Sequence, residues 1–555
     1  MNSNKLACFK SSYLLFVAFL LVLPQIITKN MVIGSDAIFH FNRFYETAMQ
    51  IRHGNFHYYL SLYGFQQSAR IVNGFYGPLF AYLQGLLVLI AGSWFRYQVL
   101  SNFCLYLLAM VSMEELLKSF WLSKNMRINL SIIFTSTFAI QYWVTRQGFT
   151  SWGAALFPWC LIPMVRLYQE EKLPVIATAI SLALMVQVHI FSGLLLASCY
   201  GIYFGVLMLR SNNRWLLGKQ LILAVLLFLP LVGNLLVSWF QLYGANRILP
   251  PFINQQMFLN TINGTSYYWV LNPCFLLVFF GGLFFFASKS RSQNLFFRTS
   301  MKGGLFFCLL STSLVPWRYL VAKKVFVIQL IQFPFRFFVP ATILLIVAFA
   351  ASPFQQKFEK WLRIGTVVAI IQMLLLSLFT LAPWQTDAAF QKAGGHVFLR
   401  SANLEATKRA FYSNDLSEAL ALVEKATPDY LPQYGKAEKN AYQAYQTSVI
   451  ERNADFEKRV VSGGLEVSWQ GLKKQWVELP IICYGATLVI DEKGKPIDYC
   501  VNQNGSLRLK EQRGENRVYI YYPQSPSLLF SLGLLGGTLL LLFVVSKKEF
   551  RRGII

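Results

Sequence analysis

Runs of apolar residues with almost no charge recur along this chain. The cores of such runs lie at 14–27, 221–237, 275–287, 341–351, 367–381 and 528–545. A membrane-spanning helix needs about 20 mostly apolar residues, so each run can form most of a span. The chain is also only 14% charged, whereas soluble domains carry about 25% charged residues. We therefore expect an α-helical polytopic membrane protein.

The net charge of +25 is unevenly distributed along the sequence. Residues 382–526 carry 18 Lys/Arg and 17 Asp/Glu, whereas the rest of the chain carries 32 Lys/Arg and 8 acidic residues. The basic excess therefore lies in short loops between apolar runs, where Lys and Arg hold loops in the cytoplasm. A nucleic-acid-binding protein would carry such charge on a soluble face, so no nucleic-acid partner is expected.

Basic clusters predict which loops are cytoplasmic. The clusters are Lys118, Lys124 and Arg127; Arg166 and Lys172; Arg210, Arg214 and Lys219; Lys289, Arg291, Arg298 and Lys302; Lys357, Lys360 and Arg363; and Lys547, Lys548, Arg551 and Arg552. The spans between them are expected at 11–28, 97–117, 128–145, 149–167, 175–190, 193–209, 221–239, 268–288, 303–319, 335–351, 364–381 and 527–545. This arrangement has about twelve spans, both termini in the cytoplasm and residues 382–526 outside the cell.

Residues 76–93 have two interpretations. If both 76–93 and 97–117 crossed the membrane, every later loop would invert and the basic clusters would lie outside. We therefore expect 76–93 to lie along the outer interface, within a first outer loop that covers 29–96. The alternative is one additional span with a local violation of the charge rule. The first 28 residues lack a small-x-small cleavage site, so they are expected to form an uncleaved span of the 1–381 membrane domain.

The extracytoplasmic segment 382–526 divides into two parts. Residues 395–455 read as a helical lead-in, and residues 456–523 read as a small antiparallel β domain. Strands are expected at 466–469, 475–483, 487–490, 498–502, 506–510 and 517–522, with glycine-containing turns between them. Cys483 and Cys500 lie here, and their spacing leaves a disulfide open. Residues 527–555 are the final span and the cytoplasmic tail.

Only two of the acidic residues in the membrane part face outward, Asp36 and Glu46. On a helix, Asp36, His40 and Arg43 would share one face. A carboxylate beside these two cationic side chains stays ionised, which makes Asp36 the candidate catalytic base with His40 and Arg43 in support. The alternative is that Asp36 caps the helix that follows it. Glu46 is expected to be a solvated helix-face residue.

Several outward cations accompany this carboxylate. They are Arg146, Arg247, Arg318, Lys323, Lys324 and Arg336. Arg336 follows Gln332-Phe333-Pro334-Phe335, where proline and aromatics predict a rigid re-entrant turn. Arginine offers a bidentate fork for phosphate oxygens, so Arg336 and Arg146 are the candidate phosphate-binding residues. For Arg146 and Arg318 the alternative role is to reach the lipid headgroups. Near a span end, His189 is either a site residue or a satisfied polar group between helices.

A carboxylate with cations at the outer surface suits a particular reaction. A sugar carried on a lipid phosphate needs its leaving phosphate stabilised by cations. The acceptor hydroxyl needs a carboxylate to position it or remove its proton. The outer surface therefore favours transfer of a lipid-linked sugar.

The arrangement of the chain resembles the type C (GT-C) glycosyltransferases, in which a first span is followed by an outer loop with an Asp motif. Narrower motifs are similar to the bacterial membrane proteins labelled 6-pyruvoyl-tetrahydropterin synthase-related. These motifs are Gly34-Ser35-Asp36, Phe39-His40 with Arg43, Tyr76-Gly77-Pro78-Leu79, Arg146 before Phe157-Pro158, His189, Gln332-Phe333-Pro334-Phe335-Arg336 and Pro428-Asp429-Tyr430-Leu431-Pro432. The resemblance covers most of the chain. It departs at Gly148-Phe149-Thr150, where the family has a Gly-Glu pair, and this puts an acidic role there in doubt.

The resemblance implies an enzyme of the bacterial plasma membrane. It would transfer a sugar from a polyprenyl-phosphate donor to an envelope glycan or glycolipid acceptor on the outer face, in contact with membrane lipids. Whether a divalent metal is a cofactor is left open. Pterin synthesis needs a zinc held by three histidines, and His53 and His57 have no apparent third ligand, so that activity is rejected.

Two other functions use the same features without bond chemistry. A lipid or polysaccharide transporter would need ionisable residues buried along a pathway in mid-span, and few are present. A non-enzymatic envelope assembly factor would act through the outer domain alone.

Overall fold

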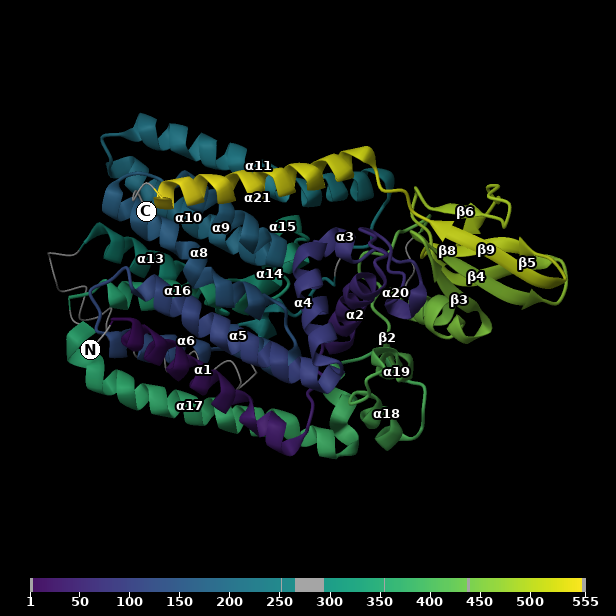
Figure 1. Cartoon of the computed structure of the whole chain (residues 1–555), viewed down its shortest axis with the longest axis horizontal. Helices are drawn as coiled ribbons and strands as arrows, with labels where there is room; N and C mark the ends of the chain where they lie inside the picture. Colours follow the sequence, from purple (N-terminus) through teal and green to yellow (C-terminus); the bar gives the residue numbers. More distant parts are fainter. Residues whose placement is uncertain (1–2, 251, 265–293, 354, 437–439, 552–555) are drawn as a thin grey trace. The chain divides into compact units, whose positions relative to one another are not determined.

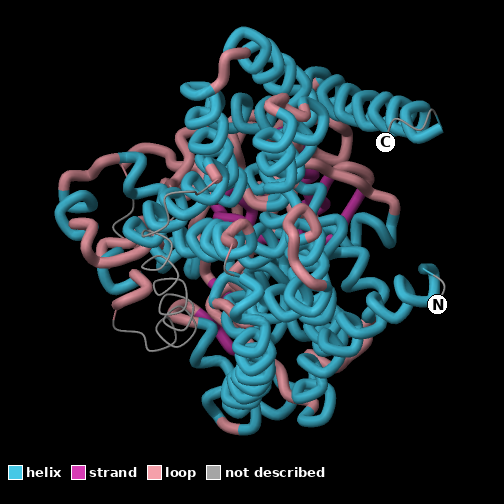
Figure 2. Tube along the Cα trace, turned by 90° about the vertical axis from the view of Figure 1, so that its left-hand side faces the viewer, coloured by secondary structure: helices cyan, strands magenta, loops and turns pink. Residues whose placement is uncertain are grey.

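The computed structural model describes residues 3–250, 252–264, 294–353, 355–436 and 440–551. Helices make up most of the described chain, as Figure 2 shows, and strands are confined to the C-terminal half. The chain divides into two compact units. Unit 1 comprises residues 1–34, 98–228 and 252–389, and unit 2 comprises residues 35–97, 229–251 and 390–555.

Unit 1 is a bundle of helices. Its helices are α1 (Ser3–Thr28), most of α5 (Trp94–Leu117), α6 (Lys124–Thr135), α7 (Phe138–Arg146), α8 (Thr150–Glu170), α9 (Val175–Val188), α10 (Ile190–Arg210), the first half of α11 (Arg214–Ala245), α13 (Leu295–Leu310), α14 (Trp317–Ala322), α15 (Phe326–Ile331), α16 (Phe338–Ala350) and α17 (Glu359–Leu381). Helices α8, α9 and α10 pack against one another, α13 packs on α16, and α17 contacts α1 and α6 (Figure 1).

Five helical segments in the described residues are long and apolar enough to cross a membrane. They are Trp94–Leu117, Ile190–Arg210, Arg214–Ala245, Gln355–Gln385 and Pro526–Val544. Shorter apolar helices lie at Ser12–Thr28, Pro78–Ala91, Val175–Val188 and Pro334–Ala350. The structure therefore supports a helical membrane protein, and the larger number of spans stays a prediction. The predicted span 268–288 lies outside the described residues.

Two predicted spans are wrong as continuous helices. Residues 128–145 form α6 and α7, separated at Ser136 and Thr137. The Ser136 hydroxyl donates to the Ile133 carbonyl at 2.7 Å and the Thr137 hydroxyl donates to Phe134 at 2.6 Å. Such bonds compete with the helical ladder. Residues 303–319 are likewise divided, because α13 ends at Leu310 and α14 begins after Pro316.

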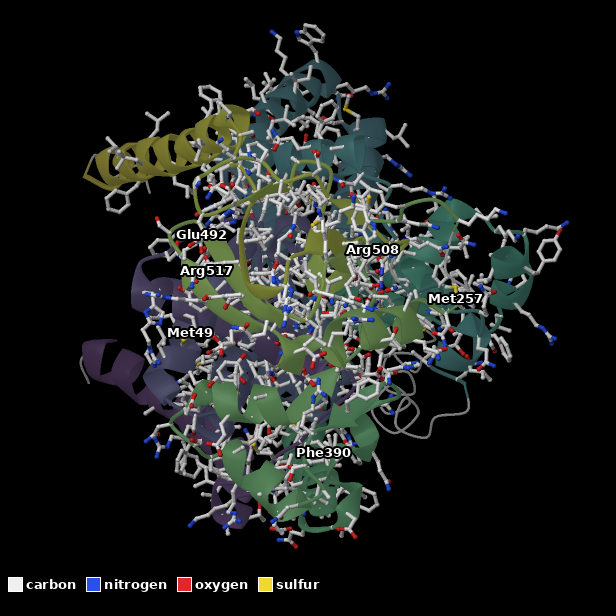
Figure 3. All side chains as sticks on the ribbon, turned by 90° about the vertical axis from the view of Figure 1, so that its right-hand side faces the viewer. Met49, Met257, Phe390, Glu492, Arg508 and Arg517 are labelled. Carbon is white, nitrogen blue, oxygen red and sulfur yellow. The ribbon has the colours of Figure 1, made fainter. Side chains whose placement is uncertain are left out.

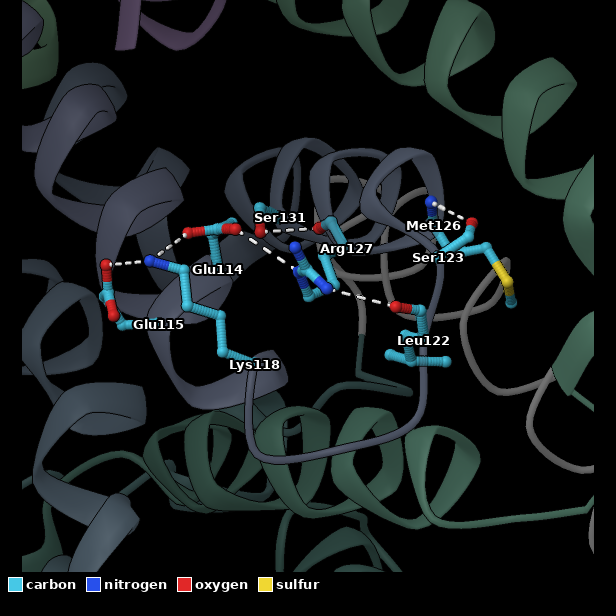
Figure 4. A network of polar contacts seen from close by, with 8 residues as sticks. All are labelled: Glu114, Glu115, Lys118, Leu122, Ser123, Met126, Arg127 and Ser131. Carbon is cyan, nitrogen blue, oxygen red and sulfur yellow. Dashed lines mark hydrogen bonds and ion pairs between the residues drawn. The ribbon is translucent and has the colours of Figure 1, made fainter. Parts of the chain in front are cut away.

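A charge network closes the turn between α5 and α6 in unit 1 (Figure 4). The Lys118 ammonium lies 3.2 Å from Glu114 and also pairs with Glu115. Arg127 reaches Glu114 at 3.3 Å and donates to the Leu122 carbonyl at 3.0 Å. Two basic residues of the predicted cytoplasmic cluster therefore hold the two acids at the end of α5.

Unit 2 combines short helices with antiparallel strands. Its helices are α2 (Ala37–His53), α3 (Asn73–Tyr76), α4 (Pro78–Ala91), α18 (Leu404–Ala410), α19 (Leu416–Leu422), α20 (Ala441–Tyr445) and α21 (Pro526–Arg551). Its strands are β1 (Val397–Leu399), β2 (Val423–Lys425), β3 (Glu457–Val461), β4 (Gly464–Gly471), β5 (Gln475–Ile482), β6 (Leu488–Ile490), β7 (Cys500–Val501), β8 (Ser506–Glu511) and β9 (Gly514–Tyr521). All six predicted strands are present. Strands β1, β2 and β3 were not predicted, and β1 and β2 lie in the segment 395–455 that was predicted to be helical.

The strands of unit 2 form three antiparallel sheets with orders β1-β2, β3-β4-β9-β6 and β5-β8-β7. Trp469 on β4 donates to Glu511 on β8 at 3.0 Å and thereby joins the two larger sheets. Tyr59, Leu62 and Phe75 of the first loop lie in the same apolar cluster as Leu465 and Ile481 of the strands. The strands therefore share their core with the loop predicted to precede the second span.

On the exposed side of these strands, Arg517 is paired with acidic side chains. Its guanidinium lies 3.6 Å from Glu466, 3.5 Å from Glu492 and 2.5 Å from Glu515. Figure 3 shows Glu492 and Arg517 side by side on this unit. Cys483 is buried and Cys500 is exposed, and both are free thiols. The disulfide that the spacing left open is therefore not formed.

Glu46 corrects a prediction, because it is buried rather than solvated, with 1% of its surface exposed. Its carboxylate accepts main-chain N–H groups of Tyr63 at 2.7 Å and Gly64 at 2.9 Å, and the Gln50 amide at 2.8 Å. Burial raises the pKa of Glu46, and these hydrogen bonds oppose the rise. Glu46 therefore organises the turn that follows residue 62.

His57 fastens the first loop to the end of β9. Its Nδ1 accepts N–H groups of Tyr59 at 3.2 Å and Leu60 at 3.0 Å, and its Nε2 lies 3.1 Å from the Tyr522 carbonyl oxygen. A ring that accepts at one nitrogen and donates at the other is neutral. Burial lowers the pKa of His57 to about 4.

We predict that acid destabilises the protein through His57. Between pH 6.5 and 4 the unfolded chain binds a proton that the folded ring excludes, so the free energy of unfolding falls by about 3 kcal/mol as the pH falls. The thermal unfolding midpoint of detergent-solubilised protein, followed against pH, measures this loss. In the His57→Gln variant the unfolding midpoint should depend less steeply on pH, whereas His53→Gln should keep the wild-type dependence. An unchanged slope in His57→Gln would contradict the role of His57.

Candidate functional site

Asp36 stands directly before α2 and is half-buried. Its carbonyl accepts the His40 N–H at 3.0 Å, so Asp36 and His40 have the predicted helical spacing. The Asp36 side chain, however, forms no capping hydrogen bond with the helix. A capping aspartate would accept an N–H from the first turn. The geometry therefore disfavours the interpretation of Asp36 as a helix cap.

Arg43 lies about two turns beyond Asp36 along α2 and is buried, with 1% of its surface exposed. Its Nε donates to the Asn73 side-chain oxygen at 3.1 Å, and its guanidinium lies 4.3 Å from the centre of the Tyr76 ring. Burial lowers the pKa of Arg43 to about 10. Within unit 2, the Arg43 guanidinium therefore packs against the Tyr76 ring. His40 is buried and stacks on Phe44, with ring centres 5.7 Å apart.

Burial and three charged side chains influence the pKa of Tyr76. Its pKa is raised, by burial first and also by the Asp429 and Asp36 carboxylates, whereas Arg43 lowers it. Tyr430 lies beside it, with ring centres 5.4 Å apart, and stacks on Phe75 at 5.1 Å. Two sequence motifs far apart in the chain, at 76–79 and 428–432, therefore meet in unit 2 near Asp36.

The segment that carries Asp429 is held by Arg70, which is fully buried. The two terminal nitrogens of Arg70 donate to the Thr427 and Asp429 carbonyls, each at 2.7 Å. Tyr430 follows with a φ of +66°, a conformation that costs energy in a residue other than glycine. Such strain persists only where surrounding contacts impose it, and Arg70 supplies two of them.

Lys425 completes what we call the Asp36 cluster, namely Asp36, Arg43, Tyr76, Lys425, Asp429 and Tyr430. Partial burial lowers the pKa of Lys425, and the Asp36 and Asp429 carboxylates raise it. Sequence reasoning selected Asp36 and Arg43 but missed the other members as site residues. Only the short 76–79 and 428–432 motifs, noted for their resemblance, could have indicated them.

Arg146 lies in unit 1, exposed at the end of α7. Its main chain packs against Gly34, the last residue of the first unit-1 segment. The Gly34 N–H donates to the Gln147 side-chain oxygen at 2.7 Å, and a methyl group on Gly34 would come within 2.3 Å of the Arg146 Cα. Only glycine allows this approach, which fixes the chain two residues before Asp36.

His189 connects α9 and α10 in unit 1. It is the N-cap of α10, and its Nδ1 accepts the Ser192 N–H at 3.2 Å and lies 2.8 Å from the Ser192 hydroxyl. The structure therefore places His189 in a helix-capping role. Its ring also lies 6.3 Å from that of Phe149.

Arg336 lies in the short turn Pro334–Phe337 of unit 1, after Gln332, whose φ of +59° bends the chain. Its Nη1 donates to the Ile331 carbonyl at 3.2 Å and to the Gln332 side-chain oxygen at 3.1 Å. Its guanidinium also lies over Phe191 at 5.3 Å and Phe333 at 5.0 Å. None of these four groups carries a negative charge.

The six predicted site residues thus divide between the units. Asp36, His40 and Arg43 belong to unit 2, and Arg146, His189 and Arg336 belong to unit 1. Within the described residues, no three or more His, Cys, Asp or Glu side chains form a group that could hold a metal ion. Comparisons with family models, with curated proteins and with solved structures find no match. Any functional assignment therefore rests on the residues of the chain itself.

We predict that Gly34→Ala destabilises unit 1 by about 1–3 kcal/mol, because the added methyl group displaces the Arg146 main chain. The Gly201→Ala control places a methyl group on α10 where no heavy atom lies within 4 Å. Alanine there stabilises the helix by up to about 1 kcal/mol. Thermal unfolding of both variants in detergent measures the difference. A wild-type midpoint for Gly34→Ala would contradict the close approach.

Proposed function

We propose that the chain is a GT-C-type membrane glycosyltransferase that transfers a sugar from a polyprenyl-phosphate donor to a cell-envelope acceptor on the outer face. One observation carries the proposal. The Asp36 carboxylate does not cap α2, and it lies in electrostatic range of a buried tyrosine and a lysine that also sense Asp429. A carboxylate in such a cluster is a candidate functional group.

The reaction has clear requirements of the protein. Asp36 takes the proton of the acceptor hydroxyl as its oxygen bonds to the anomeric carbon of the sugar. The bond between that carbon and the phosphate oxygen breaks, and polyprenyl phosphate leaves with the electron pair. Cations must stabilise this phosphate, and we assign that role to Arg336 and Arg146.

Arg43 and His40 act through Asp36 and Tyr76 in this proposal. The Arg43 guanidinium, fixed by Asn73, keeps positive charge beside the Tyr76 ring. His189 takes no part in the chemistry of this proposal. It only caps α10.

The proposed topology keeps residues 76–93 on the outer side. The helix α4 has 14 residues. At 1.5 Å per residue such a helix is about 21 Å long, and the hydrocarbon core is about 30 Å thick. Helix α9, which is expected to be a span, has the same length. The interfacial interpretation of α4 therefore rests on the positions of the basic clusters rather than on its length. About twelve spans, a bacterial plasma membrane and outward placement of 382–526 remain parts of the proposal.

We predict that Asp36→Asn lowers sugar transfer at least about 100-fold, because the amide cannot accept the proton. The assay uses purified protein in lipid nanodiscs, a polyprenyl-phosphate-linked radiolabelled hexose and an envelope fraction as acceptor. Asp415→Asn is the matched control, since Asp415 is an exposed cap of α19 whose side chain accepts the Ser417 N–H at 2.9 Å. An asparagine preserves that cap.

Wild-type transfer by Asp36→Asn would remove the proposed base. Transfer absent from the wild-type protein would reject the enzyme and leave the transporter and the assembly factor. Movement of the intact labelled lipid between the two leaflets would then identify the transporter.

A further inference from the structure

Lys425 ends β2 and is held in place by main-chain pairing. Strand β2 pairs with β1 in antiparallel register, with Val397 opposite Lys425. The N–H of the next residue, Ala426, donates to the His396 carbonyl at 2.9 Å. Two residues after Lys425, Arg70 fixes the Thr427 carbonyl. The base of the Lys425 side chain is therefore fixed on both sides.

The Lys425 ammonium joins two segments that enter unit 2 from unit 1. It donates to the Ala393 carbonyl at 2.7 Å, in the segment that enters unit 2 at Phe390. It also donates to the Ser35 carbonyl, and Ser35 is the first residue of unit 2. The Ser35 carbonyl belongs to the peptide that links Ser35 to Asp36. Lys425 thus binds the peptide group that leads into the candidate base.

The same ammonium lies in the electrostatic range of both carboxylates of the Asp36 cluster. A lysine ammonium has three N–H donors and carries a full charge. Two of its donors act on main-chain carbonyls, so its geometry is set by the chain rather than by the carboxylates. It therefore supplies a positive charge at a fixed position beside Asp36 and Asp429.

We propose that Lys425 is the positioning residue of Asp36, which holds the Ser35–Asp36 peptide in place so that the carboxylate meets the acceptor hydroxyl. This inference rests on the proposed function for its chemistry. It does not rest on that function for its geometry, because the two hydrogen bonds exist independently of any substrate. Lys425 does not itself touch the reacting atoms in this mechanism.

The first test measures hydrogen exchange of the full-length protein in nanodiscs. Lys425→Met should raise the exchange of amides in residues 35–38 and 391–394, because both carbonyl anchors are lost. Lys458→Met is the matched control. Lys458 is another half-buried lysine, and it donates to the Gln66 carbonyl at 2.7 Å and the Pro480 carbonyl at 3.1 Å. The Lys458→Met variant should raise amide exchange around Gln66 and Pro480 and leave the exchange of residues 35–38 unchanged. Wild-type exchange at 35–38 in Lys425→Met would overturn the proposal.

The second test measures transfer of the labelled hexose by the same variants. Misplacement of a catalytic group by about 1 Å can cost about 100-fold in rate, so Lys425→Met should lower kcat by 10- to 100-fold with little change in KM for the donor lipid. Lys425→Arg should recover much of kcat, because arginine can donate to both carbonyls. A purely structural lysine would lower the amount of folded protein and leave kcat per folded molecule unchanged.

The two tests separate the two proposals. If wild-type protein transfers sugar and Asp36→Asn does not, then wild-type kcat in Lys425→Met overturns the positioning role. If wild-type protein transfers no sugar, the proposed function fails, and the positioning role in catalysis fails with it. Raised exchange at 35–38 together with a lowered kcat and rescue by arginine supports the role.

Discussion

Cationic side chains in unit 2 donate hydrogen bonds to main-chain carbonyls of segments that are far apart in the sequence. Arg70 binds the carbonyls of Thr427 and Asp429, Lys425 binds those of Ser35 and Ala393, and Lys458 binds those of Gln66 and Pro480. A carbonyl removed from water costs free energy unless it is hydrogen-bonded. These cations satisfy such groups and fasten the predicted first outer loop to the C-terminal segment. The shared apolar core of the strands and the loop depends on the same connection.

This use of the cations affects the carboxylates nearby. Lys425 and Arg43 lie close to Asp36 or Tyr76, yet the bonds that fix them go to carbonyls and to an amide oxygen. The Glu46 carboxylate instead accepts main-chain N–H groups and so stabilises the fold.

Sequence patterns predicted regular elements well where one physical signal dominates. Alternating apolar residues and glycine turns located β4, β5, β8 and β9, whereas the charged edge strand β3 was hidden by its polar residues. Hydropathy failed at Ser136 and Ser311, because small hydroxyl residues interrupt a helix without lowering its apolar character greatly. Asp36 was singled out because only two acids of the membrane part are predicted to face outward. Lys425 was not, since its contact with Ser35 joins residues 390 positions apart.

The proposed chemistry depends above all on the side of the membrane that unit 2 occupies, because lipid-carried sugars for envelope glycans are used outside the cell. Cys500 is exposed on β7, whereas Cys483 is buried. A membrane-impermeant maleimide applied to intact cells that produce the protein therefore tests the side directly. We expect Cys500 to be labelled in intact cells and the label to disappear in Cys500→Ser. Labelling of Cys500 only after the cells are broken would contradict an outward-facing Asp36 cluster.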